Sequence, residues 1–145
     1  MRWALASLHL IALGIGLGAV WGRSRALRGP LDAGAVQRAL AADVWWGVAA
    51  LIWLATGLWR LFAGTEKATS YYMTSIWFLI KMGLFVLIVL LEVWPAVTFT
   101  RWRAVRRRSE MPDTRSAAAL ANISVIQAAL VAAIVGAAAA MARGY

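Results

Sequence analysis

Four long apolar runs, separated by short polar stretches, dominate the chain. They extend over about residues 3–22, 44–62, 74–97 and 117–141. Each run is about 20 residues long, which is enough for a helix to cross a hydrocarbon core of about 30 Å. Lipid offers the backbone no hydrogen-bond partners, and these runs lack the alternation of barrel strands, so the pattern predicts helices. We predict an all-α fold: an antiparallel, up-down four-helix transmembrane bundle forming a single integral membrane domain over residues 1–145.

The composition supports this class and excludes several functions. Hydrophobic residues make up 63% of the 145 residues, more than is usual for a soluble domain. The net charge of +9 is concentrated between the apolar runs, which indicates contact with anionic lipid headgroups rather than with nucleic acid. The chain has no cysteine, so disulfides and thiolate metal sites are excluded. The first run is too long for a typical signal-peptide core, and we expect it to be retained.

The positive charges also predict an orientation. The second connection holds only Arg60 and Lys67, beside Glu66. Positively charged loops remain on the cytoplasmic side, so we expect the first and third connections there and both termini outside. Those two connections hold ten arginines: Arg23, Arg25, Arg28, Arg38, Arg101, Arg103, Arg106, Arg107, Arg108 and Arg115.

Most of the nine tryptophans lie where interfacial belts are expected. Tryptophan and tyrosine prefer this depth because they are partly apolar and partly polar. Trp53 is the exception, since it falls in the middle of the second run. The expected outer belt is Trp3, Trp59, Trp77, Tyr71 and Tyr72, and the expected inner belt is Trp21, Trp45, Trp46, Trp94 and Trp102.

One histidine, His9, interrupts the first run, and one lysine, Lys81, interrupts the third. Measured along each helix from its outer end, the two residues lie at similar depth. A charge inside a bilayer costs several kcal/mol, so the face that carries Lys81 is expected to point into the bundle, towards His9. At about 100° per residue, that face of the third helix holds Thr74, Trp77, Lys81, Phe85, Ile88 and Glu92.

Two interpretations of this pair are open. Neutral imidazole is a good axial ligand for haem iron, and Lys81 would then neutralise a propionate or ligate the metal. Trp53 and Trp77 would line an apolar slot, with Arg60 near its outer end. The simpler interpretation is that His9 hydrogen-bonds to a neighbouring helix while Lys81 reaches outward to the interface. A single histidine excludes bis-histidine ligation within one chain.

Further polar residues cluster towards the inner end. Asp43 opens the second run and Glu92 lies about one turn from the end of the third, at the depth of Arg23 and Arg101. Carboxylates level with arginines favour structural ion pairs over catalytic chemistry.

The first run also carries Gly14, Gly18 and Gly22 at the spacing that allows close helix packing. These glycines lie on the side roughly opposite His9, whereas Gly16 lies within about 20° of it. We expect the three glycines to meet the fourth helix, with a second protomer or a larger membrane complex as the alternative.

Several segments together resemble a known family. They are "LHLIALGIGLGAVWGRSRAL", "ADVWWGVAALIWLATGLWR", "EKATSYY" and "FLIKMGLFVLIVLLEVWPAVTFTRWR", which span about residues 5–103. They are similar to the predicted bacterial membrane proteins grouped as domain-of-unknown-function family 2214. This resemblance implies a multi-pass protein of the bacterial cytoplasmic (inner) membrane.

More distantly, the chain is similar to two haem-linked families with four helices, the bacterial membrane protoporphyrinogen oxidase and the copper-resistance D-type domain. The oxidase family has a histidine in its first helix and a lysine in its third, matched by His9 and Lys81. This similarity implies haem b as a cofactor, with His9 as the metal ligand.

Two function classes follow. The first is a protein that binds haem b or a related porphyrin and has a redox role. The alternative is a non-enzymatic accessory or structural subunit that packs against a larger membrane complex, and a transporter ranks third. The sequence shows no nucleophile–base set, zinc-ligand spacing or phosphate-cradling loop, so it assigns no catalytic residue.

Overall fold

The fold is known from a computed structural model that describes residues 2–62 and 75–143. In this part of the chain there are four helices, α1 (Arg2–Arg28), α2 (Ala33–Phe62), α4 (Ile76–Arg106) and α5 (Ala117–Arg143), and no strand. All four are long and apolar enough to cross a membrane. The predicted all-α fold of four membrane helices is therefore confirmed.

All four helices extend beyond the apolar runs that predicted them, α5 by only two residues. α1 continues six residues beyond Gly22 to Arg28, α4 nine beyond Val97 to Arg106, and α2 begins eleven before Val44. The added turns are rich in alanine and arginine, which favour helix as strongly as leucine does. Hydropathy thus marks only the apolar part of each helix. The predicted start of the third run, at Thr74, lies outside the described residues.

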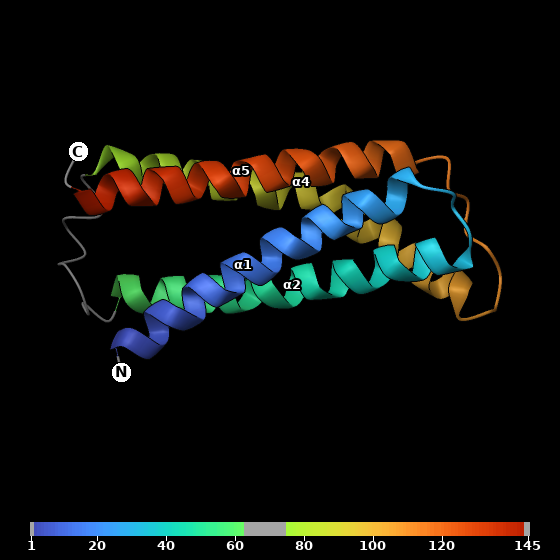
Figure 1. The fold of residues 1–145 in the computed structure, drawn as a ribbon, viewed down its shortest axis with the longest axis horizontal. Coiled ribbons are helices and arrows are strands. Elements are labelled where there is room, and N and C mark those ends of the chain that lie inside the picture. Colours follow the sequence, from blue (N-terminus) through green and yellow to red (C-terminus); the bar gives the residue numbers. More distant parts are fainter. Residues whose placement is uncertain (1, 63–74, 144–145) are drawn as a thin grey trace.

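The helices run alternately up and down, and both chain termini lie at the same end of the bundle (Figure 1). α1 packs against α2 and α5, and α4 packs against α5. α2 and α4 follow one another in the chain but approach each other only briefly. The bundle is therefore a ring of helices that is least tightly closed between α2 and α4.

Buried side chains form two clusters. One lies at the end with the connections 29–32 and 107–116, and includes Leu27, Phe99 and Trp102. The other lies nearer the middle, around Val20, Trp46 and Ile134. Elsewhere large apolar side chains such as Leu51 and Leu90 are exposed, as expected for helices surrounded by lipid.

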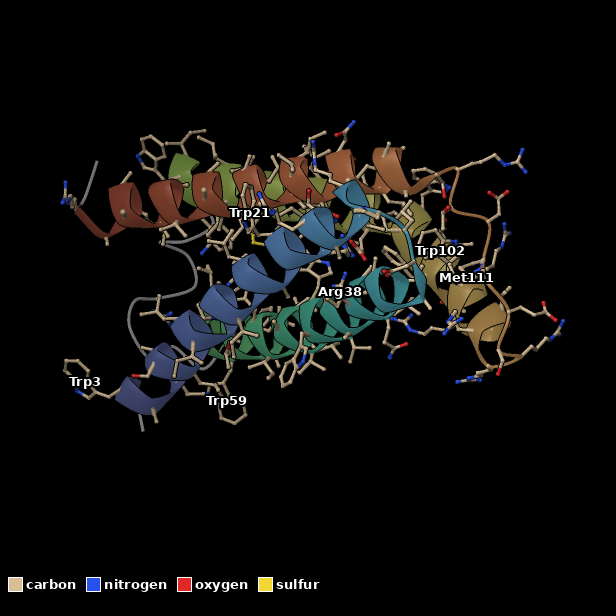
Figure 2. All side chains as sticks on the ribbon, turned by 45° about the vertical axis from the view of Figure 1, so that its right-hand side comes forward. Trp3, Trp21, Arg38, Trp59, Trp102 and Met111 are labelled. Carbon is tan, nitrogen blue, oxygen red and sulfur yellow. The ribbon has the colours of Figure 1, made fainter. Side chains whose placement is uncertain are left out.

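The tryptophans only partly follow the expected belts. Trp3 and Trp59 are exposed near the end that holds the termini, and Trp102 lies towards the opposite end (Figure 2). Trp46 and Trp102, however, are buried in the two core clusters, so their side chains do not face outward as those of belt residues do. Both sit on the inward-facing side of their helix, and depth alone cannot distinguish the two sides. Tyr71 and Tyr72 lie outside the described residues.

Candidate functional site

His9 is held against α2 by a hydrogen bond. Its Nδ1 lies 2.8 Å from Oγ1 of Thr56. The Thr56 hydroxyl donates its one hydrogen to the carbonyl of Ile52, 2.7 Å away, so it accepts from the imidazole. In neutral His9 the proton is therefore on Nδ1 and the lone pair is on Nε2. Gly57 faces the imidazole, since a Cβ there would lie 3.4 Å from His9 Cε1.

Two aromatic rings continue from His9 across the bundle. Trp53 on α2 lies 5.6 Å from the imidazole, measured between ring centroids, and Phe85 on α4 lies 5.6 Å from Trp53, edge to face. The indole Nε1 of Trp53 is buried and has no hydrogen-bond partner in the described part of the chain. A buried donor without an acceptor costs about 1–3 kcal/mol. This indole is therefore a polar group for which a ligand could supply the acceptor.

The other residues predicted for this site lie around the same half of the bundle. Lys81 precedes Phe85 by one turn and thus lies on the same face of α4, with its Nζ 5.2 Å from the centre of the Phe78 ring. Arg60 is half-buried in the last turn of α2, and Trp77 is half-buried in the first turn of α4. The structure joins His9 to Trp53, whereas a common pocket for His9 and Lys81 stays a prediction.

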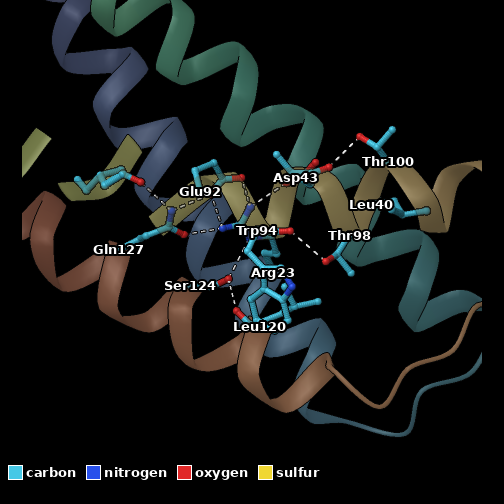
Figure 3. Close-up of polar contacts among 12 residues, drawn as sticks. Arg23, Leu40, Asp43, Glu92, Trp94, Thr98, Thr100, Leu120, Ser124 and Gln127 are labelled. Atoms are coloured by element: carbon cyan, nitrogen blue, oxygen red, sulfur yellow. Dashed lines mark hydrogen bonds and ion pairs between the residues drawn. The ribbon is translucent and has the colours of Figure 1, made fainter. Parts of the chain in front are cut away.

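A second polar site surrounds Arg23, and we call it the polar cluster (Figure 3). The Arg23 side chain is fully buried and reaches all three of the other helices. Its Nη1 donates to Asp43 (2.8 Å) and Glu92 (2.9 Å), and its Nη2 donates to Glu92 (3.0 Å) and Gln127 (2.6 Å). Its Nε donates to Ser124 at 2.9 Å. All five guanidinium hydrogens thus have an acceptor.

The polar cluster is completed by Arg103, not by the predicted Arg101. Arg103 Nη2 lies 2.5 Å from Asp43 Oδ2, whereas Arg101 is exposed. Arg101 and Arg103 are two residues apart on α4, so their side chains point about 200° apart around the helix axis. Only one of them can therefore face α2. The cluster then holds two cations, Arg23 and Arg103, and two carboxylates, Asp43 and Glu92.

The polar cluster is a junction of all four helices in which two cations balance two carboxylates. Gln127 also donates to Glu92 at 2.7 Å, and the Arg23 guanidinium lies 5.5 Å from the centre of the Phe99 ring. Such a junction holds helices together in lipid, where an unpaired charge would cost several kcal/mol. Within residues 2–62 and 75–143, no group of three histidine, cysteine or acidic side chains could hold a metal ion.

Sequence reasoning missed some partners at both sites. Thr56 carries the only side-chain hydroxyl between Gly47 and Trp59. A single hydroxyl in an apolar run needs a polar partner, and this could have predicted Thr56 as a partner of His9. In the last run the missed partner is Ser124, whose hydroxyl accepts from Arg23 Nε, whereas the expectation that Gln127 hydrogen-bonds across the bundle is confirmed.

Three glycines of α1 do not pack against another helix in the described part of the chain. A Cβ added at Gly14, Gly18 or Gly22 would meet nothing within 4 Å. The expected contact with the fourth helix is therefore wrong at these positions. Gly16, on the other side of α1, does face the bundle, since its Cβ would lie 3.4 Å from Ala49. α1 thus has one close-packed face and one open face, and we call the open one the glycine face.

The fold and these sites define a membrane protein with four spanning helices and a polar junction in its interior. The family described as "Predicted membrane protein (DUF2214)" matches residues 1–145, and the chain belongs to this family. No curated protein and no solved structure matched the chain.

Proposed function

We propose that this protein binds haem b or a related porphyrin through His9 and has a redox role in the membrane. The observation that carries the proposal is the His9–Thr56 hydrogen bond at 2.8 Å. Histidines that ligate metals almost always donate their other ring N–H to a neighbouring acceptor, which fixes the ring and its tautomer. Here Thr56 is that acceptor, and Nε2 is the ring nitrogen that would ligate iron.

The chemistry of the surrounding side chains supports a flat apolar ligand with an acidic edge. Trp53 and Phe85 offer aromatic surface beside His9, and the buried Trp53 Nε1 needs an acceptor. Lys81 and Arg60 are cations in this half of the bundle that would hold propionates. When bound, haem would supply one-electron redox chemistry, while these residues orient it and exclude water.

Absorption spectroscopy of the purified protein tests this proposal. Protein from haem-replete cells is expected to show a Soret band that His9→Ala abolishes. Thr56→Val should retain haem but shift its reduction potential, because the orienting hydrogen bond is lost. Arg101→Gln, an exposed change at the opposite end, is the matched control and should leave the spectrum unchanged. A folded, colourless wild-type protein, or a Soret band that survives His9→Ala, would refute it.

The glycine face favours a second candidate function, an accessory subunit or homo-oligomer in a larger membrane complex. Each glycine in a helix interior costs about 1 kcal/mol relative to alanine, and contacts among residues 2–62 and 75–143 do not explain Gly14, Gly18 and Gly22. Small residues at this spacing allow another helix to approach closely in lipid. Gly18→Leu should break a complex observed in mild detergent, and Gly83→Leu, at an open position on α4, is its control. Equal effects of both changes would exclude this interface.

We further propose that the protein lies in the bacterial cytoplasmic membrane with both termini outside. The end formed by connections 29–32 and 107–116 carries most of the arginines, which supports placing it in the cytoplasm. A reporter enzyme that is active only outside the cytoplasm, fused after Tyr145, should be active. An inactive but stable fusion would reverse the orientation.

A further inference from the structure

A cavity of about 360 Å³ opens between the end of α1 and the start of α5. Its lining combines cationic and polar residues with apolar ones, and it includes no acidic residue. We call it the interface pocket. Its walls are Leu27, Arg28, Gly29, Leu31, Thr114, Arg115, Ala117, Ala118 and Asn122.

Arg28 is positioned in this pocket by two hydrogen bonds. Its Nε donates to Ser24 Oγ at 3.3 Å and its Nη2 donates to Asn122 Oδ1 at 2.9 Å. Within the described part of the chain, its Nη1 makes no hydrogen bond. The guanidinium therefore has a fixed orientation and retains donors for an anion, and a planar fork of this kind suits phosphate oxygens.

The second cation of the pocket is already neutralised. Arg115 pairs with Asp113, whose pKa is lowered by the hydrogen bonds from the Arg115 side chain and backbone, so this carboxylate is ionised at neutral pH. The positive charge that an anion would meet thus comes mainly from Arg28. The first turn of α5, at Ala117 and Ala118, adds the partial positive charge of a helix N-terminus.

The surfaces next to the pocket are apolar and face the surrounding medium. Trp21 precedes Arg28 by about two turns on the same face of α1, and it is 53% exposed. On α5, Ile126 follows Asn122 by one turn and is 48% exposed. A ligand anchored at Arg28 would therefore continue along exposed apolar side chains towards the middle of the bundle. This arrangement matches the anionic headgroup and acyl chains of a phospholipid. A free phosphate would make no contact with the exposed apolar side chains beside the pocket.

We propose that the interface pocket is a specific site for the phosphate headgroup of an anionic phospholipid, with Arg28 and Asn122 as its main polar contacts. A site of this kind differs from general attraction of arginines to lipid, because it depends on one position and not on the total charge. Basic pockets between membrane helices are a known way of selecting acidic lipids.

Native mass spectrometry of the delipidated full-length protein tests the site. With added phosphatidylglycerol, the wild-type protein should retain the lipid, and Arg28→Gln should weaken retention about tenfold. Arg107→Gln removes the same charge from an exposed position outside the pocket and should change retention by less than about twofold. Asn122→Leu provides a second variant at an exposed position, where correct folding is expected, and should also weaken retention.

Three outcomes would overturn the proposal. Equal losses for Arg28→Gln and Arg107→Gln would show general electrostatic attraction. Equal retention of phosphatidylcholine and phosphatidylglycerol would show that the pocket does not select the anionic headgroup. Displacement of phosphatidylglycerol by inorganic phosphate, at concentrations where chloride has no effect, would show that the site recognises the free anion.

Discussion

Replacing Arg23 by glutamine would remove the cation that joins all four helices. In the native protein two cations balance two carboxylates in the polar cluster. After the change Asp43 still has Arg103, but Glu92 keeps only the Gln127 amide at 2.7 Å. Removing one partner of a fully buried ion pair costs about 3–5 kcal/mol. The Glu92 side chain is 23% exposed, so we expect a cost near the lower end, about 3 kcal/mol. That is a large part of a total stability of about 5–15 kcal/mol.

The structure also predicts which second change relieves this loss. Arg23→Gln combined with Glu92→Gln restores neutrality, so the double variant should be more stable than Arg23→Gln alone. Arg23→Gln combined with Asp43→Asn should be less stable than that double variant, because it leaves Glu92 charged and deprives Arg103 of its partner.

Unfolding in mixed micelles with increasing denaturing detergent, followed by tryptophan fluorescence, measures these differences. Arg101→Gln is the control, and its effect should stay within about 0.5 kcal/mol, as for most exposed substitutions. The reasoning is refuted if Arg23→Gln is as stable as Arg101→Gln, or if Glu92→Gln destabilises the Arg23→Gln protein further.

Three further predictions concern other parts of the chain. Thr56→Val removes the acceptor of the imidazole and should lower the free energy of unfolding by about 1–3 kcal/mol, measured in the same titration. Gly16→Leu should destabilise the bundle by about 1–3 kcal/mol through overpacking, whereas Gly14→Leu, at an open position, should not; thermal unfolding distinguishes them. The Asp113–Arg115 pair should persist until the pH falls below the usual value of 3.8 for the Asp113 pKa, since the folded-state pKa is lowered; carbon NMR of the carboxyl group would show this.

The helices could be predicted from the sequence because every segment that crosses lipid must be an apolar helix of about 20 residues. Apolar runs of sufficient length identify spanning helices without any knowledge of tertiary contacts. The same rule could not locate the ends at Arg28, Ala33 and Arg106, because past the lipid boundary the helix is maintained by propensity and packing.

The polar contacts were less predictable because they depend on how each helix is rotated about its axis. Depth placed Arg23, Asp43 and Glu92 at one level, and the structure joins all three. Depth could not choose between Arg101 and Arg103, which differ by only about 3 Å along the axis but point to opposite sides of the helix. Likewise, it indicated that His9 needs a partner without selecting Thr56.

The polar cluster also constrains the order of events during biosynthesis. Arg23 leaves the ribosome before any of its acceptors, since Asp43 follows 20 residues later and Gln127 follows 104 residues later. A nascent first helix therefore meets the translocation channel with a guanidinium that has no counterion. An arginine at the centre of a membrane helix costs about 2.5–3.5 kcal/mol, and Arg23, at the end of the apolar run, adds a part of that cost to insertion of the first helix alone. We expect this segment to wait at the channel or at the bilayer surface until the second helix is synthesised, so that the two enter the membrane as a hairpin.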